Sequence, residues 1–227
     1  MSPADALLAA VLADPDADLP RLQFADLLDD GGDHPRAEFI RVQCALAGDP
    51  DSLPLRVRSQ ALVVRHGTAW LAPLRARGEP LQSAATHGWF RRGFVEDVWM
   101  PAGVFVAKGE KLLRRAPVRT LTVTKSARGE LRELFGGEPL RRLREVGFAG
   151  RHGGELAAAV SAAPWLPPRL VVRNCGLGDE DAGHLVDAQA DGWRWAPELL
   201  DVSHNPLSNE GLDLLRHRFG DAVRCDR

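Results

Sequence analysis

The eight residues Leu200–Leu207, LDVSHNPL, constrain the fold of this 227-residue chain more than any other stretch. Leu200 and Val202 are two residues apart, so on a short strand both side chains point to the same face. The chain must then leave the strand. An asparagine at the turn, Asn205, can satisfy backbone groups of a neighbouring segment with its side-chain amide. Leu207 then returns to the interior, and the pattern predicts a short strand that feeds a core.

The pattern recurs along the second half of the chain. LVVRNCGL, from Leu170 to Leu177, matches it in full, and weaker copies begin at Val98, Leu121, Val146 and Val223. Successive starts are separated by 23, 25, 24, 30 and 23 residues, and an insertion at Asp191–Ala196 explains the interval of 30. This spacing, and an asparagine position that also accepts cysteine, resemble leucine-rich repeats. The residues that would build the repeats are Leu170, Val172, Cys175, Leu177, Leu200, Val202, Asn205 and Leu207.

Helical patterns fill the intervals between the predicted strands. Leu185 with Val186, and Leu212 with Leu215, are apolar at helical spacing. A strand followed by a full helix resembles the ribonuclease-inhibitor type of leucine-rich repeat, over about residues 91–227. The resemblance implies an α/β fold: a short leucine-rich-repeat solenoid of about five or six parallel strands on the concave face, with helices on the convex face.

The N-terminal residues predict helices of another kind. Ser2, followed by a proline and by Asp5, forms a helix start with a capping box. The segment Asp5–Gln43, DALLAAVLADPDADLPRLQFADLLDDGGDHPRAEFIRVQ, resembles the bacterial repeat-companion domain, a short module found beside repeats. It departs from that pattern at Phe24, where tyrosine is usual, and at Leu27–Leu28, where Trp-Leu is usual. The resemblance implies a helical module and no enzymatic activity.

Three segments follow from these patterns. We predict a helical repeat-companion domain at residues 1–47, a helical connector at 48–85 and the repeats at 86–227. A terminal repeat exposes an apolar end, so we expect the N-terminal helices to serve as an all-helical cap domain. Trp89 and Phe90, just before the first repeat, are expected to be buried.

Charge is unevenly distributed, although the chain as a whole carries only −2. Residues 1–50 carry a net charge of −7, residues 51–150 carry +9 and residues 151–227 carry −4. The basic middle could bind nucleic acid or an acidic partner, chiefly through its arginines between Arg114 and Arg144. The alternative is that these bases solvate helices or face the acidic N-terminal part of the same chain.

The composition indicates a cytoplasmic protein. No apolar run approaches the ~18 residues of a transmembrane helix. The acidic N-terminus lacks the basic region of a secretory signal. Three cysteines, Cys44, Cys175 and Cys225, lie far apart and suggest reduced thiols.

No motif for catalysis, a cofactor or a metal is found. None of the seven histidines stands at metal-ligand spacing, and no nucleophile elbow or phosphate-binding loop occurs. Asp14, Asp16 and Asp18 alternate as in the opening of a calcium loop. Position six of that loop is Leu19 instead of glycine, and position twelve is Ala25 instead of glutamate. We therefore expect no catalytic residues, no cofactor and no metal.

A repeat array offers a concave surface on which outward residues alternate with core residues. That surface predicts a non-enzymatic protein-interaction or scaffold module. The alternatives are nucleic-acid or acidic-partner binding through residues 51–150, a regulatory subunit of an enzyme, or side chains that only solvate the sheet. The predicted partner-binding residues are Asp97, Trp99, Thr122, Thr124, Lys125, Arg173, Asn174, Asp201, Ser203 and His204.

Overall fold

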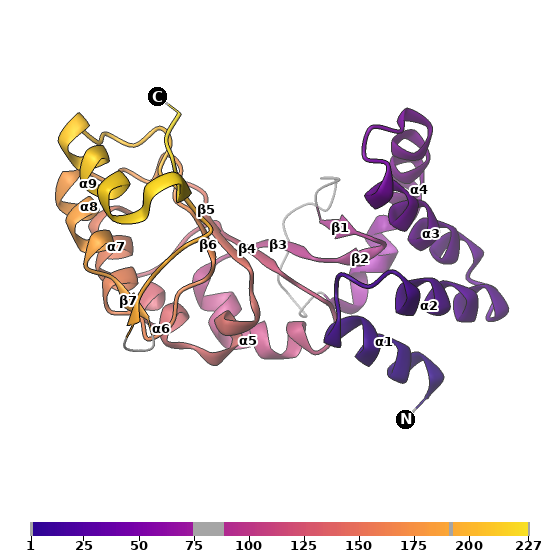
Figure 1. Ribbon diagram of the computed structural model, residues 1–227. Coiled ribbons are helices and arrows are strands. Elements are labelled where there is room, and N and C mark those ends of the chain that lie inside the picture. The colour runs from indigo at the N-terminus through magenta and orange to yellow at the C-terminus, as the bar shows by residue number, and fades with distance from the viewer. Residues whose placement is uncertain (1, 75–88, 191–192, 227) are drawn as a thin grey trace. The chain divides into compact units, whose positions relative to one another are not determined.

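The computed structural model describes residues 2–74, 89–190 and 193–226 and shows a mixed α/β protein (Figure 1). The contacts divide the chain into two compact units, residues 1–98 with 111–118 and residues 99–110 with 119–227. Residues 75–85 of the predicted connector and residues 86–88 of the predicted repeat segment lie outside the described residues. Each unit has its own core.

Helices form most of the first unit, and consecutive helices pack against one another. The predicted capping box is confirmed at the first helix. The Ser2 hydroxyl accepts a hydrogen bond from the Asp5 amide (3.1 Å), and the Asp5 carboxylate accepts one from the Ser2 amide (3.0 Å). The helical elements are α1 Pro3–Ala13, α2 Leu19–Asp30, α3 His34–Gly48, α4 Leu53–Leu71 and the 3₁₀ turn η1 Ala72–Leu74.

A short antiparallel hairpin, β1 Phe90–Arg91 and β2 Phe94–Val95, belongs to the same unit. Its turn contains Gly93 with φ 81°. A Cβ at Gly93 would lie 2.5 Å from Cγ1 of Ile40 on α3, so only glycine allows the hairpin to approach the helix this closely. Trp89 and Phe90 are buried, as expected from the sequence.

Arg21 is fully buried in this unit, although no sequence pattern indicated its role. Its guanidinium donates hydrogen bonds to the carbonyl oxygens of Pro15 (2.7 Å), Arg91 (3.2 Å) and Arg92 (3.2 Å). It also forms an ion pair of 2.7 Å with the buried carboxylate of Glu96. Burial lowers the pKa of Arg21, and the charge of Glu96 opposes that shift. Arg21 therefore joins α2 to both sides of the hairpin.

A six-stranded sheet with the order β10-β9-β6-β5-β4-β3 organises the second unit, although the first residues of β3 belong to the first unit. The pairings from β4 to β10 are parallel. The predicted strand starts occupy one row across these strands, because each start is level with the next one along the chain. The row is Leu121, Val146, Leu170, Leu200 and Val223. The strands are β3 Asp97–Met100, β4 Thr120–Val123, β5 Glu145–Phe148, β6 Arg169–Val171, β9 Leu199–Asp201 and β10 Val223–Arg224.

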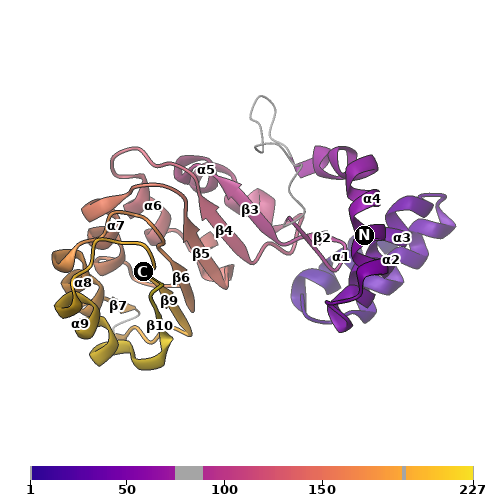
Figure 2. The same cartoon turned by 90° about the horizontal axis from the view of Figure 1, so that it is seen from above.

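Helices cover one face of this sheet, as Figure 2 shows for α6 to α9. The apolar row of strand starts points toward these helices and is fully buried from Leu121 to Leu200. These elements are α5 Ala102–Leu113, α6 Glu130–Gly136, η2 Glu138–Arg142, α7 Gly153–Ser161, α8 Asp179–Val186, α9 Asn209–Phe219 and η3 Gly220–Ala222.

The predicted insertion forms a two-stranded hairpin, β7 Gln189–Ala190 and β8 Trp193–Arg194, whose residues 191–192 lie outside the described part. Directly after it, Trp195 is buried and its indole N–H donates to the Pro167 carbonyl oxygen (3.1 Å). The insertion is thereby fastened to the unit without disturbing the register of β6 and β9.

Candidate functional site

Asn205 fixes the turns that follow β6 and β9. Its side-chain oxygen accepts hydrogen bonds from three backbone amides of the preceding copy, and its side-chain nitrogen donates to carbonyl oxygens of both copies. The predicted role of Asn205 in satisfying a neighbouring segment is therefore confirmed. Its partners are the amides of Cys175 (2.9 Å), Gly176 (2.9 Å) and Leu177 (3.1 Å) and the carbonyls of Val172 (2.7 Å) and Val202 (2.8 Å).

Six of the eight predicted core residues of the two complete copies are buried. The other two, Asn205 and Leu207, are partly exposed, although Leu207 was expected in the interior. The buried residues are Leu170, Val172, Cys175, Leu177, Leu200 and Val202.

Asn174 and His204 occupy the same position in the two copies and have left-handed backbones, with φ of 50° and 61°. Asparagine and histidine adopt this conformation more readily than most residues. The Asn174 amide donates to the Ser203 carbonyl (3.0 Å), and the His204 amide donates to the Asp226 carbonyl (3.1 Å). These turns hold two exposed polar side chains at the carboxyl end of the sheet.

The opposite face of the sheet from the helices carries a central row of side chains. Thr122 is level with Gly147, and Val171 is level with both Gly147 and Asp201. The row ends at Arg224 on β10.

Trp99 stands at the other end of this row, on the edge strand β3. The Thr124 amide donates to the Met100 carbonyl (3.1 Å), as the Ala149 amide does to the carbonyl of Val123. In the second of these hydrogen bonds, the acceptor Val123 is level with Phe148, the residue just before the donor. By the same geometry, the acceptor Met100 is level with Val123, and Trp99 is therefore level with Thr122. Trp99 is 49% exposed, which is unusual for so large an apolar side chain.

The middle of the row is shallow because its residues are small. A Cβ at Gly147 would lie 3.5 Å from Oγ1 of Thr122 and 3.7 Å from Cβ of Val171, which is ordinary contact distance. Small residues thus separate the tryptophan at one edge of the sheet from the charged residues at the other.

Those charged residues form a connected cluster. Arg173 donates to Asp201 (2.7 Å) and lies 3.6 Å from the carboxylate of Asp226, which also accepts from Arg224 (3.1 Å). The hydroxyl of Ser203 donates to Asp201 (2.6 Å) and accepts from the Asp226 amide (2.9 Å). We call these five residues the charged cluster; with two arginines and two aspartates it carries no net charge.

Asp201 is ionised in this cluster. Burial raises the pKa of its carboxyl, but hydrogen bonds from Ser203 and the Arg173 guanidinium lower it further, so the net pKa is below the ordinary value. The carboxylate therefore holds Arg173 in a fixed orientation at neutral pH.

Three of the residues expected to be exposed are instead buried: Asp97 (8% exposed), Asp201 (3%) and Ser203 (0%). They alternate with the core residues as predicted, but neighbouring side chains cover them. Arg91 pairs with Asp97 (3.0 Å), and Arg173 pairs with Asp201. Among the other predicted binding residues, Trp99, Lys125, Asn174 and His204 are exposed, and Thr122, Thr124 and Arg173 are half-buried.

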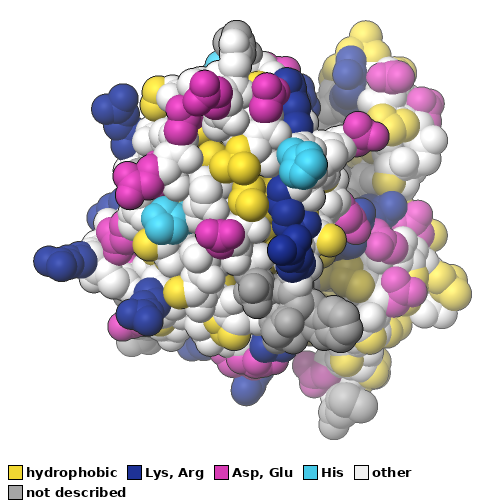
Figure 3. All heavy atoms as spheres, turned by 60° about the vertical axis from the view of Figure 1, so that its left-hand side comes forward, with side chains coloured by type: hydrophobic (Ala, Val, Ile, Leu, Met, Phe, Trp, Pro, Cys, Tyr) yellow, Lys and Arg dark blue, Asp and Glu magenta, His cyan; other side chains and the backbone are white. Residues whose placement is uncertain are grey.

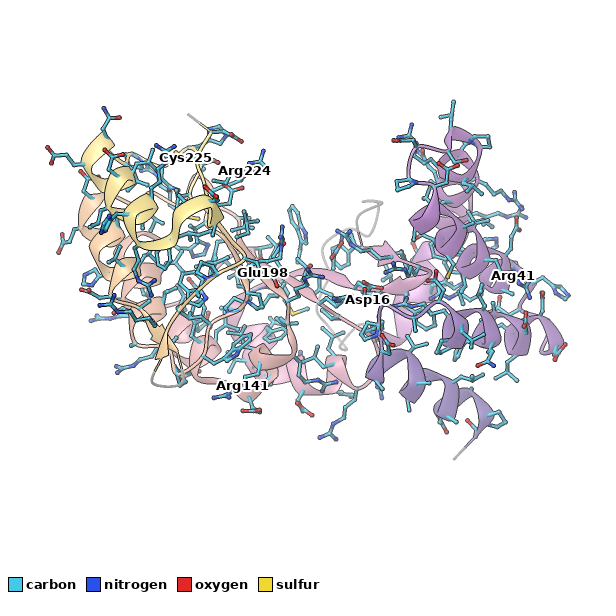
Figure 4. All side chains as sticks on the ribbon, in the orientation of Figure 1. Asp16, Arg41, Arg141, Glu198, Arg224 and Cys225 are labelled. Atoms are coloured by element: carbon cyan, nitrogen blue, oxygen red, sulfur yellow. The ribbon has the colours of Figure 1, made fainter. Side chains whose placement is uncertain are left out.

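A cavity of about 610 Å³ opens beside Asn174 and His204. It lies in the second unit, where the turns after β6 and β9 meet α9. The sequence reasoning missed part of its lining. Cys225 and Asp226 follow the start of the last partial copy at Val223. Figure 4 shows Cys225 beside Arg224 near the C-terminus. The missed lining residues include Arg151, Asn209, Cys225 and Asp226.

Ser126 and His152 form one contact that resembles a nucleophile and its base. The Ser126 hydroxyl lies 3.1 Å from Nδ1 of His152, and burial lowers the pKa of this histidine. The other ring nitrogen, Nε2, is buried without a hydrogen-bond partner among the described residues. A histidine that accepts a proton needs a group to bond its second N–H, so this geometry does not favour activation of the serine.

Acids neutralise several arginines of the basic middle region, and Figure 3 shows acidic and basic side chains interspersed on the face it draws. This arrangement favours the alternative in which the bases are solvated or paired within the chain. The pairs are Arg141 with Glu138 (3.3 Å), Arg142 with Glu110 (3.9 Å) and Arg144 with Glu198 (3.4 Å).

The alternating aspartates are also paired: Asp16 and Asp18 lie 3.5 and 3.0 Å from Arg92. Within residues 2–74, 89–190 and 193–226, no three His, Cys, Asp or Glu side chains are grouped as metal ligands would be. None of the helices described there is long and apolar enough to cross a membrane.

No protein-family model, curated protein or solved structure matches this chain. The geometry of the sheet face is therefore the basis for assigning a function.

Proposed function

We propose that this chain is a non-enzymatic protein-interaction module of the leucine-rich-repeat type. In this proposal the second unit is a short solenoid that resembles the ribonuclease-inhibitor class. The N-terminal helices are its repeat-companion cap. The partner binds the concave face of the repeats. Three free cysteines, two of them buried, suit a reducing cytoplasm.

The central row of the sheet carries this proposal. It joins an exposed tryptophan, a shallow floor at Thr122, Gly147 and Val171, and the charged cluster. Interfaces concentrate their binding energy in a few aromatic and arginine side chains beside residues that contribute shape. Trp99 and Arg173 are side chains of these kinds on this face, and Arg173 is already oriented by Asp201.

Affinity capture in the native host, with quantitative comparison of variants, tests the proposal. Trp99→Ala should reduce the recovery of specific partners about tenfold or more, and Trp99→Ala with Arg173→Ala should abolish it. Leu214→Ala is the matched control, because Leu214 is an exposed apolar residue on α9, on the helical face of the same unit. The double variant must keep the wild-type circular dichroism, since Arg173 also pairs with Asp201.

Two results would overturn the proposal. Capture of the same partners in equal amounts by wild type and double variant would exclude the sheet face. Salt-sensitive binding of nucleic acid at about 50 mM salt, unaffected by both substitutions, would favour the basic middle region instead.

A further inference from the structure

Helix α4 of the first unit has two apolar sides, only one of which the fold uses. Its inner side packs on α3, where Leu62 and Val63 are buried and the Gln43 side chain donates to the Ser59 hydroxyl (2.7 Å). A helix within a globular unit ordinarily has one apolar stripe and a polar opposite face. The second apolar side of α4 is not required by this packing.

Leu53, Val57 and Val64 form this second side, with 61%, 57% and 75% of their surfaces exposed. Spacings of four and seven residues place them in one line along the helix over about three turns. They are three of the seven large hydrophobic side chains that are exposed in the described part of the chain. Exposed Gln60, Ala61 and Thr68 lie along the same line, which we call the α4 stripe.

Positive charge flanks the α4 stripe on both sides. Helix α4 contains Arg56, Arg58 and Arg65 and no acidic residue. Arg58 is held by Glu38 of α3 through a bond of 2.6 Å. Arg56 and Arg65 are exposed and form no ion pair with another described residue. Helical geometry puts Arg56 on one side of the stripe and Arg65 on the other.

We propose that the α4 stripe docks an acidic amphipathic helix of a partner protein. Such a helix buries its own apolar line against Leu53, Val57 and Val64 and places carboxylates beside Arg56 and Arg65. A second copy of α4 is a poor occupant because it would bring arginines against arginines. An anionic membrane is also disfavoured, because the stripe has no aromatic residue and only two unpaired arginines beside it.

The probe for this inference is a fluorescently labelled helical peptide of about four turns, with leucines along one face and glutamates on both flanks. A matched peptide carries lysine in place of each glutamate. In anisotropy titrations of the whole chain at about 50 mM salt, the glutamate peptide should saturate and bind at least about tenfold more tightly than the lysine peptide.

Two variants assign this binding to α4. Val57→Ser with Val64→Ser should lower the affinity for the glutamate peptide about tenfold or more at any salt concentration, because the two substitutions remove the apolar line. Arg56→Gln with Arg65→Gln should weaken it at low salt only. Val106→Ser, at an exposed valine on α5, is the control and should bind as wild type. All four substitutions in the test variants are at exposed positions, so circular dichroism should be unchanged.

Four outcomes would overturn the inference. Two concern the peptides: neither peptide saturates, or both bind equally well. Two concern the variants: Val57→Ser with Val64→Ser leaves the affinity for the glutamate peptide unchanged, or Trp99→Ala alone abolishes it. Sedimentation equilibrium and flotation with phosphatidylserine vesicles test the other occupants. If the glutamate peptide does not bind and the wild-type chain forms a dimer that the valine variant abolishes, the stripe is assigned to a second copy. If the wild-type chain instead binds vesicles and the valine variant does not, the stripe is assigned to a membrane.

Discussion

In each of the two units, one polar side chain forms hydrogen bonds with backbone groups where the chain leaves regular structure. The two side chains differ in kind. In the second unit that residue is Asn205, whose neutral amide accepts from three N–H groups and donates to backbone carbonyls. In the first unit it is Arg21, whose guanidinium donates to three carbonyls and pairs with Glu96.

The difference is chemical. An amide both donates and accepts, so one neutral side chain serves both kinds of backbone group. A guanidinium only donates, and its buried charge requires a counter-charge. The second unit therefore depends on a residue that belongs to its repeating pattern, whereas the first depends on an ion pair between residues 75 positions apart.

Two buried cysteines allow the stability of each unit to be measured separately. Burial raises the pKa of both Cys44, in the first unit, and Cys175, in the second, to about 12. Both thiols are therefore protonated and protected until their own unit opens. In a Cys225→Ser background, thiol labelling in urea reports the opening of each unit.

The largest effect is expected for Arg21→Met. It removes the guanidinium from the buried Glu96 carboxylate and from three carbonyl groups, and should lower the free energy of unfolding of the first unit by about 3–5 kcal/mol. Labelling of Cys44 should shift to lower urea, and labelling of Cys175 should not. Adding Glu96→Leu should recover much of the loss.

Arg41→Met is the matched control for Arg21. Arg41 is an arginine of the same unit that pairs with Asp26 (2.7 Å) and Asp29, but it lies on the outside of α3 (Figure 4). Its loss should cost less than about 1 kcal/mol. An equal shift of Cys44 and Cys175 labelling in Arg21→Met would contradict the comparison, because it would mean that both units unfold as one.

Asn205→Leu should have the second-largest effect, about 2–3 kcal/mol on the second unit, because it leaves buried backbone donors and acceptors unpaired. Asn205→Asp keeps an acceptor for the three amides and loses the donor, so its cost should be intermediate. Labelling of Cys175 measures both variants. If Asn205→Asp proved as damaging as Asn205→Leu, the bonds to the carbonyls of Val172 and Val202 would be the dominant ones.

Asp201→Asn should lower the stability of the second unit by about 1 kcal/mol at neutral pH. The folded pKa of Asp201 is below the ordinary value of 3.8, so its contribution is complete above that value and is lost as the pH falls through the folded pKa. The difference between wild type and variant, measured from urea midpoints of Cys175 labelling, should therefore shrink below about pH 4. A difference that grew in acid would contradict this sign.

Arg36→Met should have the smallest effect, within about 0.5 kcal/mol. Its guanidinium lies 4.8 Å from the ring of Trp70 and 5.4 Å from that of Phe90, and burial lowers its pKa to about 10. The attraction to the rings is offset because Nη1 is buried without a hydrogen-bond partner among the described residues. A loss as large as that of Arg21→Met, measured by Cys44 labelling, would show that the rings alone stabilise a buried charge.

The sequence alone predicted the strand starts from Leu121 to Val223, the capping box at Ser2 and the bonding role of Asn205. These features depend on neighbours in the chain or on a constant interval, so a linear pattern contains them. Mixed α/β architecture followed from the same alternation of strand and helix.

Tertiary structure decided the features that depend on distant residues. The ion pair of Arg21 with Glu96, the burial of Asp97, Asp201 and Ser203, and the approach of Gly93 to Ile40 have no local signature. Alternation determines the face of the sheet to which Asp201 points. Whether that side chain is exposed depends on Arg173 of the neighbouring strand, and only the folded chain brings the two together.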